Sequence, residues 1–279
     1  MSKLTFLEAA NGKRMGKTFS TNTSISYPKV KALNSHEYEP ATLQERFDLI
    51  VKHAALGHCM FRGELTKILH KESRKKLTDL TKPNSTLFLD VDNLYLEDYI
   101  PSTSKLRSSN VESICERVLA MLPIEMQRAS YIGHASSSMG RSESKFISVH
   151  IEFMLDSAIN PTVLKKYIEH LNYSCDGIKD NLLLSDNSTG IKCILDPCVA
   201  DNTHLIYISP PVFQGIDDPF HNPEHRFCLV EKENAQLRLT GQLASMEEKS
   251  MAAIQQKTLD ALRNTAGLKR YRPKKKDYM

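Results

Sequence analysis

Apolar and polar residues recur along the chain in patterns that predict both helices and strands. Helical spacing of apolar residues predicts helices over Leu43–Ala55, Val111–Met121 and Pro161–Leu171. Short apolar runs predict strands, and Phe146–Phe153 alternates cleanly between apolar and polar positions. The other predicted strands are Cys59–Phe61, Thr86–Leu94, Tyr131–Gly133, Leu182–Asp186, Ile191–Leu195, Leu205–Ile208 and Arg226–Val230. This mixture predicts an α+β protein.

The two ends of the chain differ from its middle in composition. Residues 1–30 are rich in Ser, Thr, Lys and Gly, which predicts a polar segment with some flexibility. From residue 232 to 279, apolar residues at helical spacing predict a helical appendage that ends in a basic tail, Lys269–Lys276. We therefore expect a main domain over 1–231.

Within the first segment, Gly12–Thr18 resembles a phosphate-binding loop but has Asn11 where that motif needs glycine, so a basic surface segment is the favoured interpretation.

One predicted strand ends in two acidic residues. Asp90 and Asp92 follow an apolar run and are separated by Val91 alone. Side chains alternate along a strand, so the two carboxylates share a face, roughly 7 Å apart. Neighbouring carboxylates repel, and a shared divalent cation is the simplest reason to place them together. The alternative is an ordinary strand that ends in a polar turn.

A second segment of interest is the alternating strand Phe146–Phe153. Ser148, His150 and Glu152 share one face of it, and the small-residue turn Ser136–Gly140 precedes it. Such a hairpin suits contact with phosphate oxygens. A half-exposed strand with an incidental histidine is the alternative.

A third aspartate and several basic residues complete the set of candidates. Asp196 ends the apolar run that begins at Ile191, and Pro197 fixes it at the end of that strand. Basic residues between Phe61 and Lys76 include Arg62, Lys71 and Arg74. These side chains either contact phosphates or form a solvated surface.

Composition narrows the function only slightly. The net charge of +4 permits a nucleic-acid partner without requiring one. The six cysteines are scattered, with only Cys193 and Cys198 close together, which argues against a zinc site and favours reduced thiols in the cytoplasm. No apolar run approaches 18 residues, so neither a membrane span nor a signal peptide is indicated.

Taken in order, the three motifs resemble those of a known superfamily. Asp90-Val91-Asp92 after an apolar strand, Ser148-Val149-His150, and Leu195-Asp196 are similar to the hhhDhD, sxH and hD series of the archaeo-eukaryotic primases, or primase-polymerases, in which h is hydrophobic. The segments around Gly12 and from Gly57 to Arg74 look similar to bacteriophage and plasmid members. The resemblance covers roughly Phe61 to Val230. It implies a mixed α/β core in which an N-terminal α/β portion and an RNA-recognition-like sheet form a cleft, followed by C-terminal helices.

The resemblance also implies a chemistry. The chain would carry out template-directed nucleotidyl transfer, making or extending primers on single-stranded DNA from nucleoside triphosphates, alongside a replicative helicase in the cytoplasm of a host cell. The implied catalytic residues, which would also hold two Mg²⁺ or Mn²⁺ ions, are Asp90, Asp92 and Asp196. The implied nucleotide-binding residues are Ser138, Lys145, Ser148, His150 and His204, and the implied nucleic-acid contacts are Arg62, Lys71, Arg74, Lys269, Arg270 and Arg272. Relatives often have arginine or lysine shortly after the third aspartate, but this chain has Asp201 to His204 there, which leaves the phosphate clamp open.

Two other functions remain open from the sequence. Phe88–Asn93 also resembles the nucleophile strand of haloacid-dehalogenase-type phosphatases, in which Asp90 would be the nucleophile and Asp92 the acid, with Asp217-Asp218 as the later acidic pair. The other is a non-catalytic single-stranded DNA-binding module of a replication initiator, in which the aspartates are structural. Nucleotide-dependent primer synthesis separates the primase from both.

Overall fold

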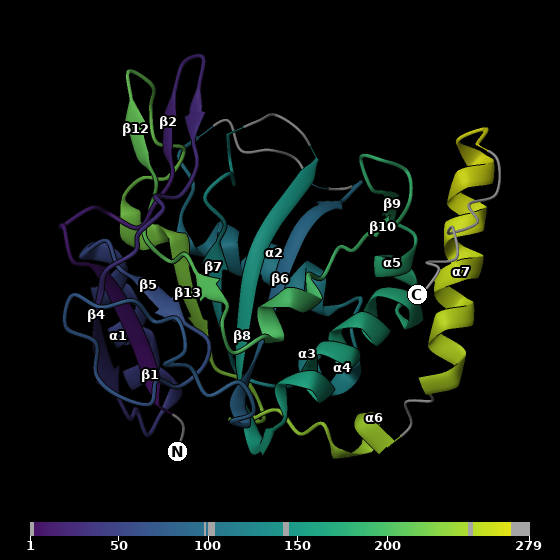
Figure 1. The fold of residues 1–279 in the computed structure, drawn as a ribbon. Helices are drawn as coiled ribbons and strands as arrows, with labels where there is room; N and C mark the ends of the chain where they lie inside the picture. Colours follow the sequence, from purple (N-terminus) through teal and green to yellow (C-terminus); the bar gives the residue numbers. More distant parts are fainter. Residues whose placement is uncertain (1–2, 98, 100–103, 142–144, 245–247, 269–279) are drawn as a thin grey trace, which may run out of the picture.

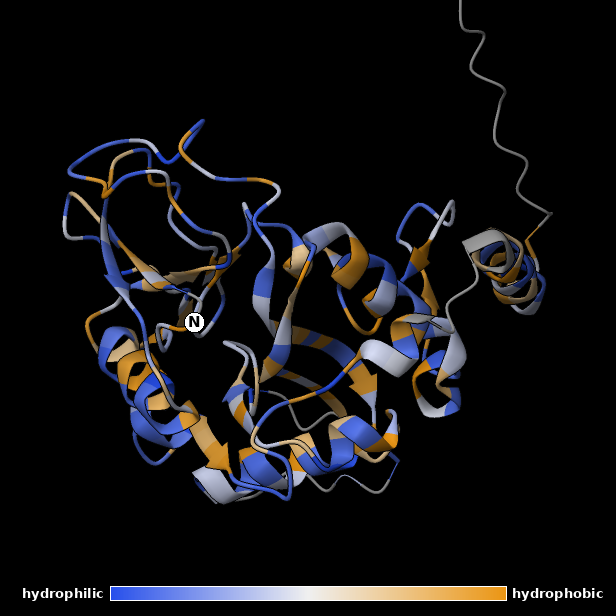
Figure 2. Cartoon of the chain, turned by 90° about the horizontal axis from the view of Figure 1, so that it is seen from below, coloured by the Kyte–Doolittle hydropathy of each residue, from blue (hydrophilic) through white to orange (hydrophobic). Residues whose placement is uncertain are grey.

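The protein is described by a computed structural model that covers residues 3–97, 99, 104–141, 145–244 and 248–268. Within these residues it is a mixed α+β protein, as expected, built around two four-stranded sheets (Figure 1). Apolar residues recur every three or four positions along the longer helices, so each of these helices has an apolar side and a polar side, seen as orange and blue bands in Figure 2.

The central sheet carries the first and second motifs. Its strand order is β13 (Phe227–Val230), β7 (Tyr131–Ala135), β8 (Phe146–Ile159) and β6 (Asn84–Tyr95), and neighbouring strands are antiparallel. A further segment, Ile194–Asp196, pairs with the free side of β6 through a bridge between Val91 and Leu195. Consequently β6 has a neighbour on each side and is not an edge strand of the sheet.

The two faces of the central sheet are covered differently. One face is apolar, and on it helix α2 (Ser108–Leu119) contacts β7, β8 and β13, while α4 (Pro161–Ser174) contacts β6. Fully buried residues of this face include Leu87, Leu89, Val91, Val149, Ile151 and Phe153. The opposite face carries the polar positions and faces the N-terminal part of the chain. The alternation predicted for residues 146–153 is thus confirmed.

The N-terminal sheet has the order β11 (Leu205–Ile206), β5 (Cys59–Phe61), β1 (Leu4–Ala9) and β4 (Leu33–Tyr38). Helix α1 (Leu43–Ala55) has the predicted bounds, and Thr42 caps it by accepting a hydrogen bond from the Glu45 amide at 3.1 Å. The expectation of a flexible polar segment over residues 1–30 is wrong for β1. That strand is central and almost wholly buried, because four of its six residues are apolar and pack in the core.

Two buried arginines join the N-terminal part to the central sheet. Arg46 of α1 contacts Glu152 of β8 at 2.6 Å, and both side chains are buried. The guanidinium of Arg62, next to β5, donates to the hydroxyl and carbonyl oxygens of Thr86 on β6. The expectation that Arg62 lies on a basic surface is therefore wrong, because strand pairing of β5 carries it into the interface between the sheets.

Shorter elements complete the fold. Strands β2 (Thr18–Ser20), β3 (Ser24–Ile25) and β12 (Val212–Gln214) form a ribbon at the top of Figure 1. The helices α3 (Ile124–Gln127) and α5 (Asp176–Lys179), the hairpin of β9 (Leu183–Leu184) and β10 (Ile191–Lys192), and the 3-10 turns Pro197–Ala200 and Pro223–Arg226 lie in the connections.

The predicted C-terminal helices are present as α6 (Thr240–Ala244) and α7 (Glu248–Thr265), with α7 at the side of the molecule away from the N-terminal sheet (Figure 1). The basic tail with Lys269, Arg270 and Arg272 lies outside the described residues. In the described part of the chain, no helix is long and apolar enough to span a membrane.

Candidate active site

The first and third motifs are neighbours in the central sheet. The Asp92 amide donates to the Ile194 carbonyl and the Asp196 amide donates to the Asp90 carbonyl, each at 2.9 Å. In this antiparallel pairing Asp90 stands opposite Asp196, so both side chains project from the same face, with their Cβ atoms about 5 Å apart. The segments are about a hundred residues apart in sequence, and their expected adjacency is confirmed.

The Asp196 segment is held in place by a buried amide from α4. The Asn172 side chain accepts hydrogen bonds from the amides of Ile194 and Leu195, at 3.0 Å each, and donates to the Leu195 carbonyl at 2.8 Å. Asn172 is wholly buried. The Asn172 side chain thereby provides hydrogen-bond partners for backbone N–H and C=O groups of Ile194 and Leu195, which belong to a segment too short to form a strand of its own.

A cavity of about 510 Å³ opens over Asp90 and Asp92. Its lining is mostly polar and comes from both halves of the molecule. The residues that line it are Lys17, Tyr27, Arg74, Phe88, Asp90, Asp92, Ser136, Ser137, Ser138, His150, Val199, Asp201, Thr203, His204, Leu205, Ile206 and Tyr207. Acidic groups thus face basic and hydroxyl groups across one space large enough for a small charged molecule.

Asp90 and His150 form a nearly buried ion pair inside this cavity. The His150 Nε2 lies 3.1 Å from Asp90 Oδ1, and the side chains are 11% and 20% exposed. Burial has the largest single effect on the pKa of Asp90 and raises it, but the interactions with His150 and the weaker charges of His204 and Lys17 together outweigh burial, so the net shift is downward. Burial also has the largest single effect on the pKa of His150 and lowers it, but the interactions with Asp90 and the charge of Asp92 together outweigh burial, so the net shift is upward. The pair therefore favours an ionised Asp90.

The other nitrogen of His150 faces a second histidine. His134 on β7 and His150 on β8 are opposite each other, and their Nδ1 atoms are 3.0 Å apart. Burial, and then the charge of His150, hold the pKa of His134 well below its usual value. His134 is thus neutral at pH 7. Both ring nitrogens of His150 are engaged, which leaves neither for the phosphate contact that the sequence resemblance implies.

Asp92 sits at an irregularity in β6. Val91 pairs with Val149 and Leu94 with Ile147, so Asp92 and Asn93 together oppose Ser148. This is a β-bulge, a feature that redirects side chains, and Asn93 has a left-handed φ of 56°. The Ser148 hydroxyl accepts from the Asn93 amide at 3.2 Å, so it supports the bulge. Burial and the neighbouring Asp90 charge raise the pKa of Asp92.

The carboxylate of Asp196 caps a turn next to the cavity. Its Oδ1 accepts from the Cys198 amide at 2.9 Å and caps the 3-10 turn Pro197–Ala200. It is not among the residues that line the cavity. The carboxylate oxygens of Asp90, Asp92 and Asp196 are not all within 4.8 Å of one another.

The implied nucleotide-binding residues divide between two places. Ser138 and His204 line the cavity, and burial lowers the pKa of His204. The ammonium of Lys145 donates instead to the carbonyl of Glu97, and this half-exposed lysine does not line the cavity. Lys145 therefore lies away from the site.

Of the implied nucleic-acid contacts, Arg74 is in the cavity wall. It donates to the Thr203 carbonyl at 2.7 Å and lies over the ring of Phe61. Lys71 is exposed on the same loop. Arg62 is buried between the two sheets.

Three cavity residues were not expected from the sequence. Tyr27 and Tyr207 are stacked with ring centroids 3.6 Å apart, and the Lys17 ammonium lies 4.9 Å from the centroid of Tyr27. The Tyr27 hydroxyl is 2.8 Å from Ser137 Oγ in the small-residue turn. Lys17 belongs to the Gly12–Thr18 segment, so its glycine-rich and basic character was the available signal. The segment leads into the strand β2 rather than a helix, unlike a phosphate-binding loop.

The acidic pair that the phosphatase interpretation needs is elsewhere. Asp218 contacts the buried Arg226 at 2.6 Å, and Asp217 is exposed and 3.9 Å from Lys105. Neither lines the cavity above Asp90.

The donor set at Asp90 fits a hard divalent cation in its chemistry. Carboxylates are ligands that Mg²⁺ and Mn²⁺ favour. Asp90 Oδ1 is buried and, apart from His150 Nε2 at 3.1 Å, has no hydrogen-bond partner among the described residues. Burial and, after it, the charge of Asp90 raise the pKa of Asp92, so a cation placed between the two carboxylates would reduce their repulsion. Asp196 uses its Oδ1 to cap the Cys198 amide, so its other carboxylate oxygen is the one that could join the set without breaking this hydrogen bond.

Comparison with known proteins adds no relative, since no family model, curated protein or solved structure matches this chain.

Proposed function

We propose that the chain is a primase-polymerase that transfers nucleotides to a primer or first nucleotide on a single-stranded DNA template. The observation that carries this proposal is the pairing of Asp196 with Asp90 across neighbouring strands. Local sequence gives no reason for these two segments to meet, whereas the motif series of the primase-polymerases requires it.

The order of elements in the central sheet supports the proposal. The chain runs β6, α2, β7, β8, α4 and then Ile194–Asp196, a β-α-β-β-α-β sequence. In space, β6 and β8 are central, with β7 beside β8 and Ile194–Asp196 beside β6. This arrangement is the one expected of an RNA-recognition-like sheet, with the N-terminal sheet as the other wall of the cleft.

The acidic residues would hold the metal ions. Asp90, Asp92 and Asp196 would bind two Mg²⁺ or Mn²⁺ ions. When bound, such ions lower the pKa of an attacking hydroxyl and neutralise charge on the transferred phosphate and the leaving group. His150 orients Asp90 and keeps it ionised through its own positive charge.

The remaining cavity residues suit a nucleoside triphosphate. Lys17, Arg74 and His204 place basic groups in the same space as the acidic pair, and the Ser136–Ser138 turn adds hydroxyl donors. These groups can take the role of the arginine or lysine that relatives carry after the third aspartate. The stacked rings of Tyr27 and Tyr207 give one wall an aromatic surface, the kind of surface on which nucleobases pack.

The test is a nucleotide-transfer assay with the full chain. It uses single-stranded DNA with and without a primer, ribo- or deoxynucleoside triphosphates, and Mg²⁺ or Mn²⁺. We expect Asp90→Asn, Asp92→Asn and Asp196→Asn each to reduce transfer by at least about 100-fold, since loss of even outer-shell partners of a metal costs about 10–100-fold. The matched control is Asp217→Asn, at an exposed aspartate away from the cavity.

The outcome also separates the alternatives. DNA binding without transfer by the wild-type chain contradicts the proposal and favours a binding module. If the wild-type chain hydrolyses a generic phosphomonoester and Asp90→Asn abolishes this hydrolysis, the proposal is contradicted and the phosphatase alternative is favoured. Transfer that survives Asp196→Asn contradicts the role given to the third carboxylate.

A further inference from the structure

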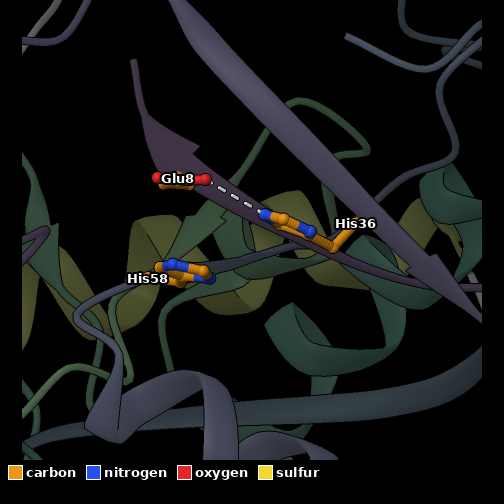
Figure 3. A group of neighbouring side chains, drawn as sticks. All are labelled: Glu8, His36 and His58. Atoms are coloured by element: carbon orange, nitrogen blue, oxygen red, sulfur yellow. Dashed lines mark hydrogen bonds and ion pairs between the residues drawn. The ribbon is translucent and has the colours of Figure 1, made fainter. Parts of the chain in front are cut away.

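A second group of metal-ligating side chains lies in the N-terminal sheet, apart from the Asp90 cavity. Glu8, His36 and His58 each offer one ligand atom, and these atoms all lie within 4.8 Å of one another (Figure 3). None of the three lines the cavity over Asp90. Glu8 Oε2 is already 3.2 Å from His36 Nε2.

Strand pairing brings the three residues together. In the register of β1 with β4, Phe6 stands opposite His36, so Glu8 and His36 are diagonal neighbours on one face. On the other side, Leu7 pairs with Cys59, and the same register continued by one residue sets His58 beside Glu8. The carboxylate therefore lies between two imidazoles from the strands on either side.

His58, the buried member of the group, contacts His53, which in turn contacts Tyr38. His58 Nδ1 is 2.9 Å from His53 Nδ1, and His53 Nε2 is 3.1 Å from the Tyr38 hydroxyl. If His58 donates to His53, and His53 donates to Tyr38, both contacts are hydrogen bonds and His58 Nε2 keeps its lone pair. This is how protein partners usually fix the tautomer of a histidine that binds a metal.

We propose that Glu8, His36 and His58 bind a Zn²⁺ ion. Two imidazoles and one carboxylate are a usual protein ligand set for zinc, and a water completes such a site. Nitrogen ligands disfavour Mg²⁺, which prefers oxygen. The cysteine spacing argued against zinc from the sequence, but this site uses no cysteine.

The site is accessible from solvent. The side chains of Glu8 and His36 are 37% and 36% exposed, which gives an ion an entry path.

Binding requires a local adjustment. The rings of His36 and His58 are nearly parallel, at 11°, with centroids 5.2 Å apart. Zinc–ligand distances of about 2.0–2.2 Å need donor atoms closer together than 4.8 Å. The half-exposed His36 ring can turn toward Glu8 and His58 without disturbing the core. Once bound, the ion would connect β4, β1 and the start of β5.

The experiment measures Zn²⁺ binding by titration calorimetry on the full chain after treatment with chelator, and thermal unfolding with and without Zn²⁺. We expect one Zn²⁺ per chain. At 100-fold excess over the dissociation constant, the unfolding temperature should rise by about 5–10 °C and return on addition of chelator. Mg²⁺ at the same concentration should not displace the ion.

Glu8→Gln and His36→Gln test the ligands, and His70→Gln, at an exposed histidine, is the matched control. We expect each ligand variant to bind at least tenfold more weakly while its circular dichroism spectrum and metal-free unfolding temperature are retained. Asp90→Asn should bind Zn²⁺ normally, so this result is independent of the proposed nucleotidyl transfer. Absence of stoichiometric binding overturns the proposal. Equal binding by all variants, or equal weakening in His70→Gln, also overturns it, because the ion would then bind elsewhere.

Discussion

Among single residues, His150 has the surroundings that most affect the chemistry of the site. It is nearly buried between Asp90 and His134, and although burial lowers its pKa, the Asp90 and Asp92 carboxylates together raise that pKa above its ordinary value. Its raised pKa means that its contribution to stability is fully present below the unfolded pKa of about 6.5 and is lost as pH rises through the folded pKa. For Asp90, whose pKa is lowered, the contribution is present above about 3.9 and is lost as pH falls. The ion pair therefore stabilises the fold most between these two values.

The first prediction concerns this coupling. Asp90→Asn removes the charge that raises the pKa of His150, so the remaining burial should bring that pKa below its wild-type value. An NMR titration of the histidine ring protons measures the shift. Asp217→Asn is the control and should leave the His150 titration unchanged. A His150 pKa that is the same in wild type and Asp90→Asn would contradict the ion pair.

The second prediction concerns the histidine itself. We expect His150→Ala to slow transfer and also to destabilise the fold, because the substitution leaves Asp90 and His134 buried without their partner. An unsatisfied buried group costs about 1–3 kcal/mol, and urea unfolding at pH 6 should show a decrease of that size. Unchanged stability would indicate that water replaces the ring at no cost.

At the scale of elements, the third aspartate depends on a helix that carries no catalytic group. Asn172 of α4 makes three hydrogen bonds to Ile194 and Leu195 and so fixes the backbone next to Asp196. The pattern of apolar residues predicted a strand over Ile191–Leu195. The structure instead divides this run into β10, which pairs with β9, and a segment that pairs with β6. The position of Asp196 thus depends on the hydrogen bonds of the Asn172 side-chain amide as well as on the pairing with β6.

The third prediction tests this role. Asn172→Leu keeps the branched shape of the side chain but removes, in a buried place, the three hydrogen bonds to Ile194 and Leu195 and a fourth to the Ile168 carbonyl. We expect a decrease of about 2–4 kcal/mol in unfolding free energy and a fall in nucleotide transfer with all three aspartates present. Hydrogen exchange should show faster exchange at the Ile194 and Leu195 amides and at Asp196, with the β6–β8 pairing protected. Transfer at the wild-type rate would contradict the role of Asn172.

The fourth prediction concerns the contact between α1 and β8. Arg46→Met leaves Glu152 as a buried charge without its partner, which typically costs about 3–5 kcal/mol. The double variant Arg46→Met/Glu152→Met should recover much of this stability, because no buried charge remains. Chemical unfolding of the single variants, the double variant and wild type gives the comparison. Equal destabilisation of the single and double variants would contradict an ion pair at this interface.

The sequence predicted some elements well and others poorly, for physical reasons. The helix Leu43–Ala55 has complete apolar spacing and a capping threonine, and its bounds were correct. The strand β1 was missed because its six residues sit among polar and glycine-rich neighbours, and its burial depends on pairing with distant strands. Asp90, Asp92 and His150 could be placed on their strands by alternation. The burial of Arg62 and the contribution of Lys17, Tyr27 and Tyr207 could not be predicted, because they arise where the two sheets meet.

Over the whole molecule, charge is distributed unevenly along the chain. Residues 1–83 contain 15 lysines and arginines and 8 aspartates and glutamates. Residues 84–268 contain 16 lysines and arginines and 24 aspartates and glutamates. Residues 1–83 thus contribute a net charge of +7 and residues 84–268 a net charge of −8, and residues 269–279, with six basic residues and one acidic residue, add +5, so the net charge of +4 conceals contributions of opposite sign. Exposed Lys71, Lys75 and Lys76 lie on the loop that also carries Arg74 into the cavity wall. Under the proposed function, we expect a template strand to approach the site along this loop.

The fifth prediction tests that approach. Replacing Lys71, Lys75 and Lys76 together by glutamine should weaken binding of single-stranded DNA. It should also flatten the dependence of log affinity on log salt by about 0.7 for each phosphate that the protein no longer neutralises. The matched control replaces the exposed Lys166, Lys179 and Lys192 of the acidic part, with the same change in net charge. Fluorescence anisotropy over a range of salt concentrations measures both. An equal effect of the two triple variants would indicate that net charge alone matters.

The pairing of early and late strands has a consequence for biosynthesis. Strand β5 acquires its neighbour β11, and β2 its neighbour β12, from segments about 140 and 190 residues further along the chain. At a translation rate of about 5–20 residues per second, the edge of β5 waits roughly 7–30 s for its partner to leave the ribosome. During that interval the nascent chain presents an unpaired apolar edge, the kind of surface that other chains join. The N-terminal sheet is thus begun first but completed only after most of the central sheet has been synthesised, and a chaperone bound to the growing chain would protect it in the time between.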